Sequence, residues 1–178
     1  MDLYNKIYLI GFMGSGKSTT GKKLATQLGW TFVDLDDKVE QNTGLSISKI
    51  FSEKGEDYFR EIEAGQLRSL ESTGNLVIAT GGGTPCFNDN MDLMKKSGLT
   101  IYLKMTPPQL RKRLYGSSEK RPLIKNLNSD QLLTFIKERL VLREKWYNRS
   151  EIIVDGMCIN INLLLSQIKQ FINHGKIT

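Results

Sequence analysis

The sequence predicts an α/β protein in which helices cover both faces of a central five-stranded parallel sheet, a three-layer α/β/α arrangement. Two observations carry this prediction. Short apolar runs alternate with helical patterns along the chain, and a glycine-rich turn joins the first run to the first helix. Such alternation favours parallel strands. After each strand the chain must return to the opposite end of the sheet before the next parallel strand can begin, and this connection is usually a helix. At 178 residues we expect a single domain over positions 1–178.

The elements follow one another with recognisable start and stop signals. The expected strands are 7–10, 30–37, 76–79, 99–103 and 152–154. We expect helices from the glycine-rich turn through Leu28, at about 37–41, and from the N-cap Ser46 to a break at Gly55. Further helices are expected at 56–70 and 88–96, from Pro107 or Pro108 with Leu110 and Leu114, and at 130–147 and 160–171. Gly29, Gly44 and Gly55 mark helix ends, and Ser46 has the position of a helix N-cap. Residues 116–128 have little apolar periodicity, so we expect a mobile excursion there.

The composition excludes several classes of protein. A net charge of +6 arises from scattered basic residues, and the one local basic cluster lacks an RNA-binding aromatic signature, so we expect no nucleic-acid partner. There is no apolar run of the ~20 residues that a membrane span needs, and the start of the chain does not fit a signal peptide. Cys86 and Cys158 have no spacing that suggests a disulfide framework or a zinc site. We therefore expect a cytoplasmic protein without a membrane partner.

The segment Gly11 to Thr19 reads Gly-Phe-Met-Gly-Ser-Gly-Lys-Ser-Thr and fits the P-loop pattern between a strand and a helix. Backbone N–H groups at such a turn and at the following helix N-terminus form a cradle for nucleotide phosphates. Lys17 would span the β- and γ-phosphates, and Ser18 would hold Mg²⁺. The expected nucleotide-binding residues are Gly14, Ser15, Gly16, Lys17, Ser18 and Thr19. The alternative is a glycine turn that merely caps an ordinary helix.

Two carboxylates at the end of the second expected strand are candidates for catalysis. Asp34 and Asp36 are two residues apart, so both would project from the same side if the strand continued through them. The third strand ends in glycines and offers no acid, which leaves Asp34 or Asp155 to direct the metal. We choose Asp34, acting through water, and assign Asp36 as the base that accepts a proton from a substrate hydroxyl. The alternative is that both aspartates only cap the next helix.

Arg60 shares one helix face with Glu56 and Glu63, which lie four residues before it and three after it. Two carboxylates could hold the guanidinium in place for bidentate capture of a substrate carboxylate. The alternative is an ordinary set of surface ion pairs. The triplet Gly81-Gly82-Gly83 follows the third strand and would let a ligand approach the backbone. Cys86, just beyond it, is expected to be a small buried residue rather than a nucleophile.

Taken together, these motifs resemble the shikimate kinase family. The resemblance rests on the P-loop, Asp34-Leu35-Asp36, Phe59-Arg60-x-x-Glu63, the glycine triplet, Arg121-Pro122-Leu123 and Leu142-Arg143. It implies a P-loop kinase fold with a mobile lid at about 115–126, and a monomer that phosphorylates the 3-hydroxyl of shikimate with ATP and Mg²⁺. It also implies that Arg60 and Arg143 hold the shikimate carboxylate and that Gly82 contacts shikimate through its backbone. Arg121 would be the lid arginine that reaches the phosphates.

Three other functions remain open from the residues. A P-loop kinase of another small hydroxy acid, such as gluconate, is the main alternative. A nucleotide-dependent switch would need a guanine-reading Asn-Lys-x-Asp motif, which the sequence lacks. A catalytically silent binding module would not need the intact Lys17, Ser18, Asp34 and Asp36.

Overall fold

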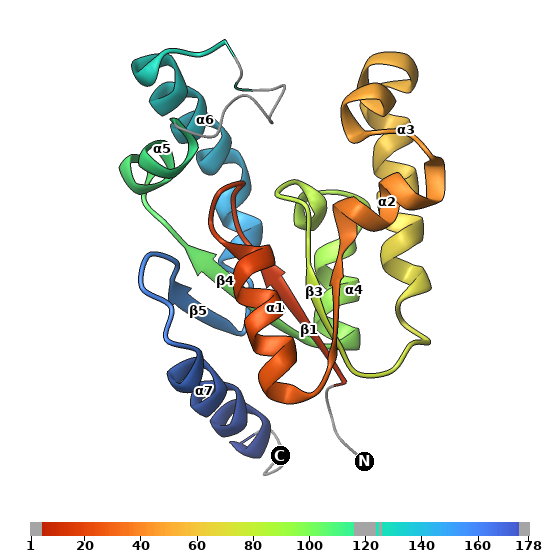
Figure 1. Cartoon of the computed structure of the whole chain (residues 1–178), viewed down its shortest axis with the longest axis vertical. Helices are drawn as coiled ribbons and strands as arrows, with labels where there is room; N and C mark the ends of the chain where they lie inside the picture. The colour runs from red at the N-terminus through yellow and green to blue at the C-terminus, as the bar shows by residue number, and fades with distance from the viewer. Residues whose placement is uncertain (1–4, 116–123, 125, 175–178) are drawn as a thin grey trace.

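The computed structural model describes residues 5–115, 124 and 126–174 (Figure 1). Its centre is a five-stranded sheet in the order β2-β3-β1-β4-β5, and every strand pair is parallel. The strands are β1 Lys6–Ile10, β2 Thr31–Asp34, β3 Leu76–Ala79, β4 Leu99–Lys104 and β5 Ile152–Asp155. The five predicted strands and their parallel arrangement are therefore confirmed.

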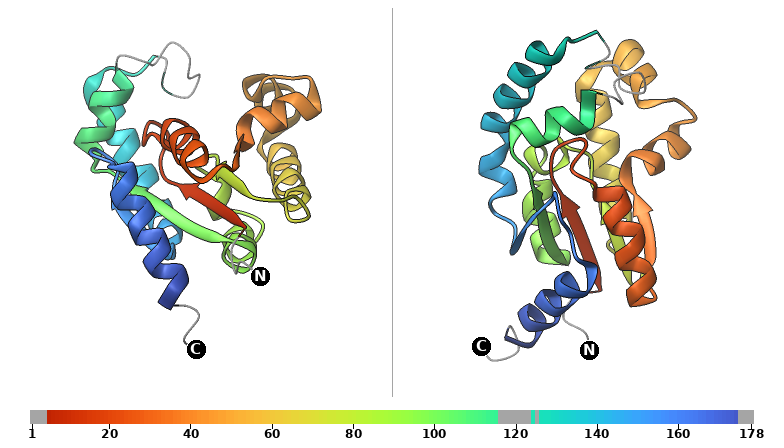
Figure 2. Two further views of the ribbon diagram at one scale, coloured as in Figure 1. Left: turned by 60° about the horizontal axis from the view of Figure 1, so that its bottom comes forward. Right: turned by 60° about the vertical axis from the view of Figure 1, so that its left-hand side comes forward.

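Helices fill the connections between these strands. They are α1 Lys17–Leu28, α2 Leu35–Thr43, α3 Ile47–Ser69, the short 3-10 helix η1 Thr84–Cys86, α4 Asn90–Ser97, α5 Pro107–Tyr115, α6 Ser129–Tyr147 and α7 Ile161–His174. On one side of the turn between β1 and α1 lie α2 and the first half of α3. On the other side lie α5 and the start of α6 (Figures 1 and 2). The P-loop thus lies between two groups of helices.

The alternation of side chains along β1 divides the core into two layers. Leu9 faces a cluster that includes Leu24 of α1 and Ile168 of α7. Tyr8 faces the opposite cluster, which includes Met94 of α4 and Ile136 of α6. Successive residues of a strand point to opposite faces, so one buried strand supplies both layers. The three-layer prediction is confirmed.

The end of the second strand differs from the prediction. We expected a strand over residues 30–37, but β2 ends at Asp34 and α2 begins at Leu35. The Asp34 side chain accepts a hydrogen bond from the backbone N–H of Asp36 at 3.2 Å, which is N-cap geometry. A hydrogen bond from a nearby backbone N–H to an aspartate side chain competes with the strand conformation. Here it favours the start of a helix. The prediction that both carboxylates project from one strand is wrong, because Asp34 caps α2 and Asp36 lies in its first turn.

The predicted helix signals are confirmed at several points. Gly29 and Gly44 end α1 and α2 with left-handed backbone, at φ 67° and φ 66°. Ser46 caps α3, and the predicted break at Gly55 is confirmed, because its backbone is non-helical, at φ 87° and ψ 173°, and α3 is kinked there. The turn η1 was not predicted, and α4 begins at Asn90 rather than at residue 88.

Two further expectations concern regions beyond the sheet. Most of the expected lid, residues 116–123 and 125, lies outside the described residues. Among the residues that the structure describes, no helix has both the length and the apolar character needed to cross a bilayer.

Candidate active site

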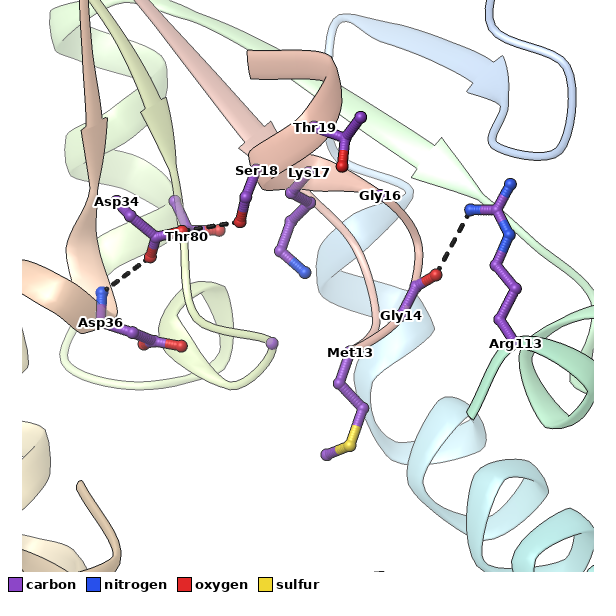
Figure 3. A pocket seen from close by; sticks show the side chains of 11 residues that line it. Met13, Gly14, Gly16, Lys17, Ser18, Thr19, Asp34, Asp36, Thr80 and Arg113 are labelled. Carbon is purple, nitrogen blue, oxygen red and sulfur yellow. Dashed lines mark hydrogen bonds between the residues drawn. The ribbon is translucent and has the colours of Figure 1, made fainter. Parts of the chain in front are cut away.

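The P-loop turn and its surroundings enclose a cavity of about 530 Å³ beyond the carboxyl end of the sheet (Figure 3). Gly16 adopts φ 95°, a left-handed conformation that glycine takes without a steric penalty, and it caps α1. Lys17 Nζ donates to the carbonyl oxygens of Gly11 at 2.9 Å and Phe12 at 3.0 Å. The lysine is thus held within its own loop, close to where a phosphate would lie. The cavity is lined by Met13, Gly14, Gly16, Lys17, Ser18, Thr19, Asp34, Asp36, Thr80, Gly82 and Arg113.

Ser18 and Asp34 approach each other across this cavity. The Ser18 hydroxyl donates to Asp34 Oδ2 at 2.6 Å, while Asp34 Oδ1 accepts the N–H of Asp36 (Figure 3). A hydroxyl and a carboxylate are the hard oxygen ligands that suit Mg²⁺. Within the described residues no cluster of three or more acidic, histidine or cysteine side chains could hold a metal by itself. The Ser18–Asp34 pair alone would leave the other positions around a Mg²⁺ to phosphate oxygens and water.

Asp36 lies in the first turn of α2, and its carboxylate lines the same cavity. Burial raises the pKa of Asp36 from 3.8 to about 6, and the nearby Glu63 and Asp34 carboxylates add to this rise, while Lys17 opposes it. A carboxylate with a pKa near neutrality is suited to accept a proton.

Each glycine of the triplet 81–83 lies against a candidate site residue. A side chain at Gly81 would meet Asp36 Oδ1 at 2.9 Å, and one at Gly82 would meet an Arg143 terminal nitrogen at 3.3 Å. A side chain at Gly83 would come within 2.5 Å of a terminal nitrogen of Arg60. The triplet thus lets side chains from α2, α3 and α6 gather around one turn of backbone.

Arg60 lies in the ion-pair arrangement that the helix spacing predicts. Its NH1 donates to Glu63 Oε2 at 2.8 Å, and its Nε and NH2 donate to Glu56 Oε1 at 3.2 and 3.0 Å. Glu63 is 1% exposed, and its other oxygen accepts the Thr84 hydroxyl at 2.5 Å. Because a guanidinium has five N–H donors and the contacts of the described residues engage three of them, one N–H remains on each terminal nitrogen.

Arg143 and Tyr147 reach the triplet from α6. Arg143 lies over the Phe12 ring, with its guanidinium carbon 5.6 Å from the ring centroid. One turn later, the buried Tyr147 hydroxyl donates to the Gly82 carbonyl oxygen. Cys86 is partly buried, and burial raises the pKa of its thiol to about 11, which favours the neutral thiol.

Arg113 lines the cavity and was not predicted as a site residue. It donates to the carbonyls of Gly14 and Gly156, at 3.3 and 3.0 Å, and so ties the P-loop to the turn after β5. The sequence did hold one sign that Arg113 faces the protein, since it lies between Leu110 and Leu114, the buried residues of α5. Arg121, the predicted lid arginine, lies outside the described residues.

Comparisons with known proteins point to one family. The family model for shikimate kinase matches residues 13–173. The chain is 42% identical over 151 residues to a shikimate kinase from Parabacteroides distasonis, covering 85% of this chain and 87% of the relative.

Solved structures of shikimate kinases are also similar to this chain. A shikimate kinase crystal structure from Bacteroides thetaiotaomicron aligns with a TM-score of 0.86 and 34% identity, over 94% of this chain and 98% of that one. A shikimate kinase from Acinetobacter baumannii in complex with shikimate aligns with a TM-score of 0.83 and 33% identity. The alignment covers 99% of this chain and 97% of that one. A deoxyadenosine kinase from M. mycoides shares the fold at 17% identity and a TM-score of 0.59. This chain belongs to the shikimate kinase family.

Proposed function

We propose that the chain transfers the γ-phosphoryl group of ATP to the 3-hydroxyl of shikimate, in the route to chorismate and the aromatic amino acids. Membership of the shikimate kinase family supports the reaction. The division of labour among the residues rests on one observation. Asp36 shares a cavity with Lys17, while Arg60 and Arg143 lie against the glycines that border it.

The donor half of the site is the P-loop. Backbone N–H groups of Gly14, Ser15, Gly16, Ser18 and Thr19 hold the phosphates, and Lys17 lies beside the β- and γ-oxygens. Ser18 and Asp34 would hold Mg²⁺, with Asp34 acting directly or through water. The ion would supply neutralising charge on the phosphate oxygens. Arg121 would add a further cation from the lid.

The acceptor half lies around Asp36 and the glycine triplet. Asp36 takes the proton of the 3-hydroxyl as the substrate oxygen bonds to the γ-phosphorus and the bond to the ADP oxygen breaks. Arg60 and Arg143 hold the shikimate carboxylate, and Arg60 uses the N–H groups that Glu56 and Glu63 do not engage. Gly82 offers backbone contact to the ring. The raised pKa of Asp36 suits this carboxylate to accept the proton.

Other features of the proposal follow from the same reasoning. A lid at about 115–126 would exclude water from the phosphates. We expect a monomer in the cytoplasm, with ATP and shikimate as its ligands and no nucleic-acid or membrane partner. Gluconate, the alternative acceptor, is not favoured, because the matched family model and the relatives described above are shikimate kinases.

A coupled ADP-release assay with shikimate, with gluconate and with no acceptor tests the proposal. We expect ADP release that depends on shikimate and on Mg²⁺, with little release in the other two reactions. Release without shikimate, or none at all from folded protein, would contradict it.

A further inference from the structure

The guanidinium of Arg60 has an edge with N–H donors and a planar face, and side chains of α3 and of a distant turn contact it. Glu56 and Glu63, both on α3, hold N–H groups at its edge. The Phe59 ring of α3 lies 5.0 Å from the guanidinium carbon, and the Phe87 ring lies nearer, with its centroid 4.3 Å from that carbon. This is well inside the ~6 Å range of a cation–π contact. Phe87 comes from the turn after η1, so it approaches Arg60 from outside the helix.

Phe87 contributes to this contact rather than to the core. It is 38% exposed and belongs to none of the three apolar clusters formed by the described residues. The neighbouring Asn88 donates from its side-chain amide to the Arg60 carbonyl oxygen at 3.1 Å. One dipeptide therefore contacts both the side chain and the backbone of the same arginine.

The turn that carries these two residues is held in an unusual conformation. Asn88 and Asp89 both have left-handed backbone, at φ 50° and φ 55°, which is uncommon outside glycine and best tolerated by Asn and Asp. Backbone bonds fix the turn on either side, from Cys86 N–H to the Gly83 carbonyl at 2.9 Å and from Asn90 N–H to the Phe87 carbonyl at 3.0 Å.

The α3 partners of Arg60 are Glu56, Glu63 and the Phe59 ring, whose centroid lies farther from the guanidinium carbon than that of Phe87. Glu56 is 53% exposed, and an ion pair on an open helix surface contributes little. Glu63 is buried and fixes only one terminal nitrogen. Support on the planar face from Phe87 restricts rotation of the guanidinium and leaves the remaining N–H groups at its edge for a ligand.

We propose that Phe87 and Asn88 form a clasp that positions Arg60 for the carboxylate of the acceptor substrate. The clasp acts through Arg60, so Phe87 and Asn88 are positioning residues. This inference rests on the role proposed above for Arg60 in binding shikimate.

Steady-state kinetics on the full chain test the clasp, with shikimate and ATP varied in turn. Phe87→Leu keeps an apolar side chain but removes the aromatic face. We expect it to raise KM for shikimate about three- to tenfold, the range for loss of a cation–π contact, with kcat and KM for ATP within about twofold. Phe87→Tyr retains the face and should keep the original KM. Tyr58→Leu removes an aromatic of similar exposure, 42%, on α3 and should change neither KM.

A double variant separates positioning from general destabilisation. Because Phe87 acts through Arg60, adding Phe87→Leu to Arg60→Ala should raise KM for shikimate no further than Arg60→Ala alone. An unchanged KM in Phe87→Leu, a rise in both KM values, or full additivity in the double variant would overturn the clasp. If Arg60→Ala itself leaves KM for shikimate unchanged, the proposed role of Arg60 fails and the clasp fails with it.

Discussion

The proposed donor and acceptor halves of this site are built in different ways. The P-loop is one continuous segment, Gly11 to Thr19, whose backbone and lysine act together. The acceptor half brings together Asp36 from α2, Arg60 from α3, Arg143 from α6 and the glycine triplet after β3. A contiguous motif depends on local conformation, whereas an assembled one depends on close packing at a turn. The two halves should therefore respond differently to mutation.

The largest expected effect comes from removing the donor lysine. Lys17→Ala should lower kcat about 10²- to 10³-fold, because it removes a cation from the transferring phosphoryl group. Shikimate affinity, measured by calorimetry, should change less than about threefold. Lys23→Ala, an exposed lysine on the same helix, serves as the control. A matching loss of shikimate affinity would mean that the halves are not separable.

Removal of the base should come next. Asp36→Asn should lower kcat at least ~10²-fold while ATP binding stays nearly intact, as expected for loss of a general base. Asp37→Asn, at the exposed neighbouring position, should have little effect. Nucleotide affinity that falls as much as the rate would place Asp36 on the donor side instead.

Packing at the triplet offers a test specific to the acceptor half. Gly83 has ordinary backbone, at φ −94° and ψ −21°, so alanine brings no backbone strain. Its Cβ would nevertheless lie 2.5 to 2.9 Å from guanidinium atoms of Arg60. We expect Gly83→Ala to raise KM for shikimate about tenfold, the effect of losing one charged hydrogen bond. Gly65→Ala, where a side chain meets open space on α3, should leave that KM unchanged.

The smallest expected effect is on the pH profile. Because burial and neighbouring carboxylates raise the pKa of Asp36 to about 6, kcat/KM for shikimate should rise with pH through about 6. At pH 5 only about a tenth of the free enzyme would carry the ionised base. Glu63→Gln removes one of these carboxylates and should move the rise to lower pH. A profile that is flat between pH 5 and 8 would contradict the assignment.

The contrast between the halves also explains what the sequence could predict. Patterns along the chain predicted the glycine-rich turn between β1 and α1, the parallel sheet and the Glu56–Arg60–Glu63 ion pairs. The structure confirms all three features. The start of α2 was misjudged because Asp34 caps the helix, a choice that strand propensity does not reveal. Spacing along the chain could not predict Arg113 at the P-loop or Phe87 on Arg60, since their partners are distant in sequence.

Separate recognition of the two substrates is tested most directly by the kinetics of Arg60→Ala. We predict that KM for shikimate rises at least about tenfold, the cost of losing a charged hydrogen bond, while KM for ATP stays within about threefold. Arg68→Ala, an exposed arginine at the end of α3, should change neither value. A larger rise in KM for ATP than for shikimate would assign Arg60 to the nucleotide and contradict the proposed acceptor site.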